Sequence, residues 1–84
     1  MQAVITNHQA KIAQTAALLA YLRREGSIST PEGRNLGIMH VAGRIQDLRK
    51  QGHIIETRRD RVATTPGSVA SVARYYLTRE RGLA

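Results

Sequence analysis

Arginine side chains dominate the groups in this sequence that could do chemistry. Eleven arginines and two lysines stand against six acidic residues, giving a formal net charge of +7. A guanidinium group carries a planar fork of N–H donors that matches phosphate oxygens and the edge of guanine. So large a positive charge on a small chain favours a polyanionic partner, such as DNA, RNA or an anionic membrane surface.

Two segments, residues 39–51 and 58–70, hold most of the side chains suited to nucleic acid. We expect base edges to be contacted by Met39, His40, Gly43, Arg44 and Asp47. We expect phosphates or a minor groove to be contacted by Arg34, Lys50, Arg58, Arg59, Arg61, Thr64 and Thr65. Two alternatives stay open: an exposed ion pair between Arg44 and Asp47, and a merely solvated charge run in the second segment.

Other chemistries find little support. There is no cysteine, which excludes disulfides and thiolate metal sites. His8, His40 and His53 are not spaced as metal ligands, and we expect His53 to have a capping or packing role. No carboxylate pair or glycine-rich phosphate loop is evident. We therefore expect neither an enzyme nor a cofactor.

Three helices are expected to position the first segment. In residues 8–25, Ile12, Ala16, Leu19 and Leu22 recur three and four apart, which predicts an amphipathic helix whose apolar face they form. A second, short helix opens with a capping threonine and a proline at 30–31 and ends at a glycine turn at residue 37. The third helix spans residues 39–51.

The faces of the third helix are predicted from its periodicity. Ile38, Val41, Ala42, Ile45 and Leu48 fall on the buried face. The opposite face then holds His40, Gly43, Arg44, Asp47 and Lys50.

Strands are expected to position the second segment. Residues 53–59 and 71–78 have the alternation and β-branched or aromatic content of strands, joined by a loop over residues 60–69. Ile28 between two serines adds a brief strand. We expect Arg49 to brace the hairpin, and Tyr75 and Tyr76 to point to opposite faces, with one of them packed on the first helix.

The middle of the chain resembles a known family. Residues 44–55 fit the pattern R-I-x-x-L-R-x-x-G-H-x-I, and residues 74–77 fit Arg-Tyr-x-Leu. Both patterns are typical of a phage and prophage helix-turn-helix family, which the chain resembles over about residues 8–78. The resemblance implies a winged helix-turn-helix fold and DNA binding. Gly33 departs from the alanine that such domains usually place there.

Together these features predict one α+β domain over residues 1–84, with flexible ends at 1–7 and 79–84 and a core at about 8–78. Its fold is a small winged helix-turn-helix, in which three helices precede a two- or three-stranded antiparallel β-wing.

The expected function is double-stranded DNA binding by a small transcriptional regulator, or by an accessory factor of recombination or replication in a phage or mobile element. The alternative is a protein–protein interaction module, acting as an inhibitor or adaptor. Structured RNA is disfavoured because its major groove is too narrow for a helix. We expect a cytoplasmic monomer or weak homodimer with no membrane association, because residues 1–7 lack a secretion signal and residues 15–22 are too short to span a bilayer.

Overall fold

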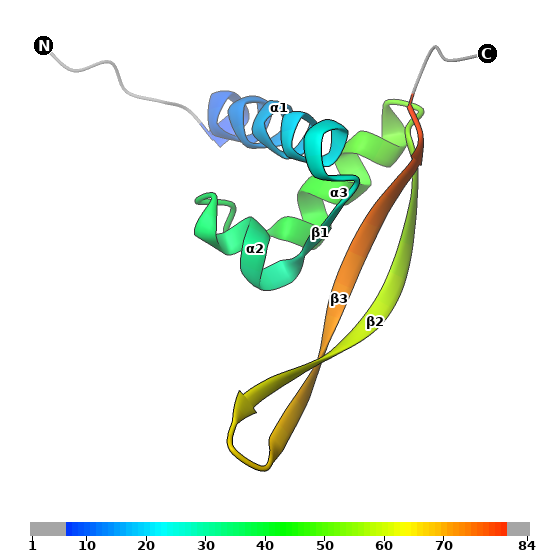
Figure 1. Ribbon diagram of the computed structural model, residues 1–84. Helices are drawn as coiled ribbons and strands as arrows, with labels where there is room; N and C mark the ends of the chain where they lie inside the picture. Colours follow the sequence, from blue (N-terminus) through cyan, green and yellow to red (C-terminus); the bar gives the residue numbers. More distant parts are fainter. Residues whose placement is uncertain (1–6, 81–84) are drawn as a thin grey trace, which may run out of the picture.

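The fold is described from a computed structural model that places residues 7–80, with side chains described for all of these except residues 7, 8 and 64. Three helices and a three-stranded antiparallel sheet form this part of the chain (Figure 1), which confirms the α+β prediction. In chain order they are α1 (Asn7–Glu25), β1 (Ser27–Ser29), α2 (Thr30–Asn35), α3 (Val41–Lys50), β2 (Ile54–Thr65) and β3 (Ser68–Arg79). No helix in the described range is long and apolar enough to cross a membrane.

The buried face of α1 differs from the predicted one. Thr15, Leu18 and Leu22 are buried, whereas Ile12 is 56% exposed and Ala16 is exposed. Thr15 tolerates burial because its hydroxyl donates to the carbonyl of Lys11 at 2.6 Å. The apolar residues of the predicted stripe therefore lie partly on the surface of α1.

The short helix α2 begins one residue earlier than predicted. Its N-cap is Ser29 rather than Thr30, and the Ser29 hydroxyl accepts a hydrogen bond from the backbone N–H of Glu32. The Glu32 carboxylate in turn accepts from the Ser29 N–H at 2.8 Å, which completes a capping box. Because Ser29 also ends β1, the cap joins the sheet directly to α2.

Helices α2 and α3 pack closely through Gly33. A Cβ atom placed on Gly33 would lie 2.5 Å from Cγ2 of Val41, a distance that real side chains do not reach. The chain then turns at Gly37, whose φ of +88° suits glycine. The glycine at position 33 thus fits the close approach of the two helices.

We expect Gly33→Ala to lower the free energy of unfolding by about 1 kcal/mol, because the added methyl overlaps Val41. Alanine in a helix normally stabilises by about 1 kcal/mol relative to glycine. In a Val41→Ala background, where the overlapping methyls are gone, the same substitution should therefore be stabilising. Urea denaturation of the four proteins measures this change of sign. Equal effects in both backgrounds would contradict the packing.

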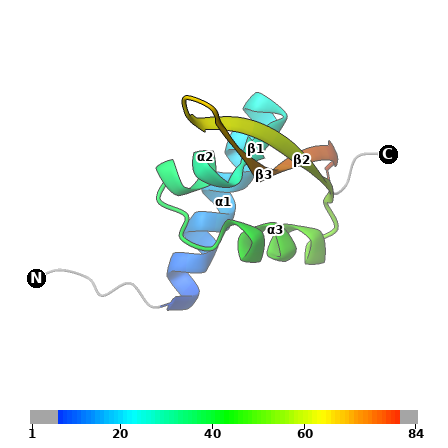
Figure 2. The ribbon, with the colours of Figure 1, turned by 90° about the horizontal axis from the view of Figure 1, so that it is seen from below.

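The third helix is shorter than predicted. It runs over Val41–Lys50, with His40 as a non-helical N-cap (φ −119°, ψ 72°), so Met39 precedes the helix. At the other end Gln51 is the C-cap, and Gly52 adopts a φ of +106°. The helix lies across α1 (Figure 2).

The sheet has the order β1-β3-β2, and the brief first strand is confirmed. Ile28 of β1 and Thr57 of β2 both pair with Tyr75 of β3. The predicted loop over residues 60–69 is wrong, because both strands continue to a turn at Pro66 and Gly67. Proline followed by a glycine at φ +83° suits a type II turn, so two residues suffice.

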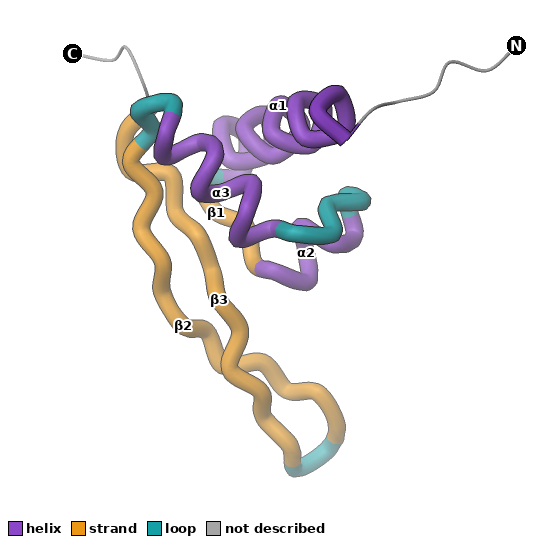
Figure 3. The backbone as a smooth tube through the Cα atoms, turned by 180° about the vertical axis from the view of Figure 1, so that it is seen from behind, coloured by secondary structure: helices purple, strands orange, loops and turns teal. Residues whose placement is uncertain are grey.

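Every described element except α2 contributes to one core. Its buried apolar residues are Leu18, Leu22, Ile28, Ile38, Val41, Ile45, Leu48, Ile55 and Tyr75. Tyr21 is partly buried and packs against this core. The hairpin formed by β2 and β3 extends beyond the helices (Figure 3).

The ends of the fold lie slightly outside the predicted limits. The first helix begins at Asn7, and β3 includes Arg79. Glu80 pairs with Arg23 of α1, which fastens the end of the sheet to the first helix. The rest of the predicted flexible ends, residues 1–6 and 81–84, lies outside the described residues.

Candidate nucleic-acid interface

The exposed face of α3 is built from residues four apart. Ala42, Gln46 and Lys50 are exposed, and lie opposite the buried Val41, Ile45 and Leu48. The prediction that Ala42 faces the core is therefore wrong. This face offers a methyl group, an amide and an ammonium group.

Two predicted base contacts, Met39 and His40, lie beside the start of this face. Met39 is 71% exposed, and His40 is exposed at the N-cap. Gly43 is half-buried on α3. Met39 and His40 thus lie at the N-terminal end of α3.

Arg44 was predicted to lie on the exposed face, and this is wrong. Its residue exposure is only 8%, and its side chain lies on the same helical face as Val41, Ile45 and Leu48. Arg44 Nε is 2.9 Å from a carboxylate oxygen of Asp47, so the alternative ion pair is present, but it is largely buried and not exposed as that alternative had it. The angle does not allow a hydrogen bond there, and among the described residues this Nε has no other acceptor. The side chains of Arg44 and the half-buried Asp47 are therefore kept in place by their ion pair.

Sequence reasoning missed Gln46. It is exposed on the centre of the face opposite the buried residues, and no contact of its side chain is found within residues 7–80. The helical spacing of Gln46 from the buried Val41 and Ile45 indicates that its side chain is exposed. The prediction placed Ala42 on the buried face and Arg44 on the exposed face, so the expected exposed face did not include Gln46.

Arg49 braces the hairpin, as predicted. Its guanidinium group donates to the carbonyl of Ile55 at 2.7 and 3.1 Å, and to the hydroxyl of Thr57 at 2.9 Å. His53 is buried at the start of β2, consistent with the expected packing role. The contact between Arg49 and Thr57 places the Thr57 side chain on the hairpin face that looks toward α3.

The predicted arginine cluster on the hairpin divides between two faces. Side chains alternate along a strand, so Arg59 and Arg61 share the face of Ile55 and Thr57. Arg58 lies on the other face, where its guanidinium is 5.1 Å from the centre of the Tyr76 ring and 3.3 Å from a Glu56 oxygen. Tyr75 is buried on the first face, which confirms that the two tyrosines point apart.

The remaining polar candidates on the hairpin lie near its tip. Thr65 is exposed beside the turn, and pairs with Ser68. Both it and Thr64 lie in β2 rather than in a loop. The side chain of Thr64 is outside the described residues.

The basic side chains fall into two groups, those in ion pairs with carboxylates and those outside any ion pair. All six carboxylate side chains, at residues 25, 32, 47, 56, 60 and 80, form ion pairs with arginines. Within residues 7–80, the cations left outside ion pairs are Lys11, Arg34, Arg49, Lys50, Arg59, Arg61 and Arg79. Four of these, Arg34, Lys50, Arg59 and Arg61, are predicted phosphate contacts, and all four are exposed.

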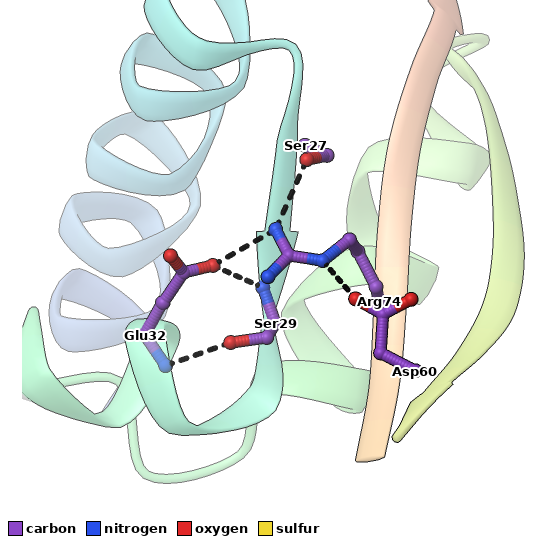
Figure 4. Close-up of polar contacts among 5 residues, drawn as sticks. All are labelled: Ser27, Ser29, Glu32, Asp60 and Arg74. Carbon is purple, nitrogen blue, oxygen red and sulfur yellow. Dashed lines mark hydrogen bonds and ion pairs between the residues drawn. The ribbon is translucent and has the colours of Figure 1, made fainter. Parts of the chain in front are cut away.

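Arg74 links the hairpin to the helices (Figure 4). Its Nε donates to Asp60 of β2 at 2.5 Å. Its Nη1 lies 3.1 Å from both the Ser27 hydroxyl and the Glu32 carboxylate. One side chain thus joins β1, β2, β3 and the N-terminus of α2, and sets the direction of the hairpin relative to the helices.

Glu32 should make stability depend on pH. The Ser29 backbone N–H, followed by the Ser29 side chain and then Arg74, lowers the pKa of Glu32 below its ordinary value. A carboxyl group whose pKa is lower in the folded state stabilises the fold at pH values above its unfolded-state pKa of about 4.3. This stabilisation is lost as the pH falls through the folded-state pKa. Glutamine at 32 keeps the capping bond and removes the charge. We expect Glu32→Gln to cost about 1 kcal/mol or less at pH 7, because the side chain is partly exposed.

This difference from the unsubstituted chain should shrink as the pH falls from the unfolded value of about 4.3 through the lowered pKa of folded Glu32. Denaturation of both proteins between pH 7 and pH 3 measures it. A constant difference across that range would show that the Glu32 charge does not act through this network.

A comparison with known families agrees with this architecture. A family model described as a winged helix-turn-helix domain matches residues 13–80, which include all of α2, α3 and the hairpin. No curated protein and no solved structure matches the chain.

Proposed function

The chain belongs to the winged helix-turn-helix domain family, which suggests DNA binding, and we propose that it binds double-stranded DNA with α3 in the major groove and the hairpin on the backbone. The observation that carries this proposal is the placement of the unpaired cations. Lys50 lies on the exposed face of α3, and Arg59 and Arg61 lie on the hairpin face that looks toward α3. The phosphates of a DNA duplex bound beside α3 would contact both Lys50 and the two hairpin arginines.

We assign base readout to the exposed face of α3 and the residues before it. Gln46 is the central reader, because the N–H of a glutamine amide can donate to N7 of adenine while its oxygen accepts from the N6 amino group in a bidentate pair. Met39, His40 and Gly43 approach the bases at the start of the helix. Arg44 is not assigned to base contact, since its side chain is buried and paired with Asp47.

Phosphate contacts are assigned to Arg34, Lys50, Arg59 and Arg61, with Thr64 and Thr65 near the tip of the hairpin. Arg58 is left out of this set because it lies on the opposite face of the hairpin, where its exposed guanidinium stacks over the Tyr76 ring and pairs with Glu56. The face assignment makes Arg58 a natural control for its neighbour Arg59.

The biological role we propose is that of a small transcriptional regulator, or of an accessory factor in recombination or replication of a phage or mobile element. Such a protein would act in the cytoplasm, as a monomer or a weak homodimer. No cofactor is needed, because recognition uses only side chains and the groove.

The salt dependence of affinity tests the electrostatic part of the proposal. If four cations neutralise phosphates, log affinity for a duplex should fall against log salt with a slope of about −4. Fluorescence anisotropy with a labelled duplex at several salt concentrations measures it. A slope near zero, or no binding at low salt, would rule out the backbone contacts.

A further inference from the structure

A groove of about 500 Å³ runs between α1 and the C-terminal half of α3. Its walls carry apolar side chains from both helices, among them Ile12, Ala16, Leu19 and Leu48. Ile12 is 56% exposed, although it belongs to the most regular apolar repeat of α1. The groove therefore holds part of the apolar surface that the core of the domain leaves uncovered.

Cations flank this apolar surface. Lys11 of α1 and Lys50 of α3 both line the groove, and neither is in an ion pair with any described residue. The one carboxylate that lines it, Asp47, already pairs with Arg44. The groove thus combines an apolar floor with two ammonium groups that lack counter-charges.

A second copy of the chain is a poor match for this groove. All six of its carboxylate side chains are already paired with arginines of the same chain, so a second copy brings positive charge and no unpaired acidic side chain. The occupant that complements the groove has apolar side chains along one edge and carboxylates beside them. A groove between two helices accepts the apolar face of a third helix.

We propose that the groove between α1 and α3 docks an acidic amphipathic helix of a partner protein. The apolar face of that helix covers Ile12, Ala16 and Leu19, and its carboxylates pair with Lys11 and Lys50. The surface is separate from the centre of the exposed face of α3, which carries Gln46. Only Lys50 lies on both surfaces, so the partner and DNA would compete for that side chain.

A labelled model peptide tests the docking with the full chain. The probe is an alanine-rich helix with leucines along one face and glutamates on both edges, and binding is followed by fluorescence anisotropy. We expect Ile12→Gln to weaken binding about tenfold, through the apolar contact it removes. Lys11→Gln should weaken binding several-fold and reduce its salt dependence.

Two controls separate docking from general attraction to a basic protein. Val69→Gln changes an apolar residue of similar exposure, 58%, near the tip of the hairpin, and should leave affinity unchanged. A peptide of the same composition in scrambled order should bind at least tenfold more weakly than the amphipathic one. Circular dichroism checks that each variant remains folded.

Three results would overturn the proposal. The first is no binding of the amphipathic peptide by the unsubstituted chain, and the second is equal binding of both peptides. The third is self-association in sedimentation that Ile12→Gln abolishes, which would identify the groove as a contact between copies. Neither a positive nor a negative result depends on DNA binding, which the salt titration measures separately.

Discussion

Replacing Arg59 and Arg61 together by glutamine is expected to weaken binding to duplex DNA about a hundredfold, as two phosphate contacts of about 1.4 kcal/mol each would be lost. Both side chains are exposed on the hairpin face that carries Thr57, and neither is in an ion pair with a described residue. The slope of log affinity against log salt should become shallower by about 2. Anisotropy titrations with one duplex measure both effects.

The matched control for this prediction compares the DNA affinity of Arg58→Gln with that of Arg59→Gln. The two residues are adjacent on β2, are both exposed and carry the same charge, but they lie on opposite faces. Arg58→Gln should leave affinity within about twofold, a difference well under 1 kcal/mol. Equal losses from the two substitutions would mean that net charge, and not the face of the hairpin, determines binding.

The second large effect is expected at Gln46. Gln46→Ala should remove a preference for adenine at one position of the site, and weaken binding to the preferred duplex about tenfold or more, since a bidentate base contact is worth about 1–3 kcal/mol of discrimination. Affinity for duplexes with another base at that position should change little. Competition titrations with the four single-base duplexes measure the preference.

Arg44→Met is the informative comparison for Gln46→Ala. Arg44 is buried and paired with Asp47, so methionine should change the stability of the domain and leave the base preference intact. If Arg44→Met instead removes the preference while Gln46→Ala keeps it, the assignment of the reading face is wrong. Thermal unfolding of both variants shows whether a loss of binding follows from unfolding.

Local signals predicted the parts of the fold that depend on them. Glycine at residue 37 and proline at 31 indicated the limits of α2, and Arg49 beside Leu48 indicated a brace for the hairpin. The alternation of strand side chains predicted that Tyr75 and Tyr76 would point apart. In each case the physical constraint acts within a few residues.

Predictions failed where distant contacts decide the outcome. Thr15 and Arg44 look like surface residues in the sequence, but each is buried with a polar partner on its own helix. The length of the hairpin depends on cross-strand pairing between residues such as Arg61 and Ser71, which a count of turn-forming residues cannot show. Ile12 is likewise 56% exposed although the apolar repeat of the first helix predicts it on the buried face.

Selection of bound duplexes from a random library is the most direct test of DNA recognition by α3. The purified chain should retain duplexes enriched in one motif that contains an adenine, and Gln46→Ala should lose the enrichment at that adenine alone. A palindromic motif would in addition favour a dimer. If no duplex is retained even at low salt, the chain does not read DNA with this surface.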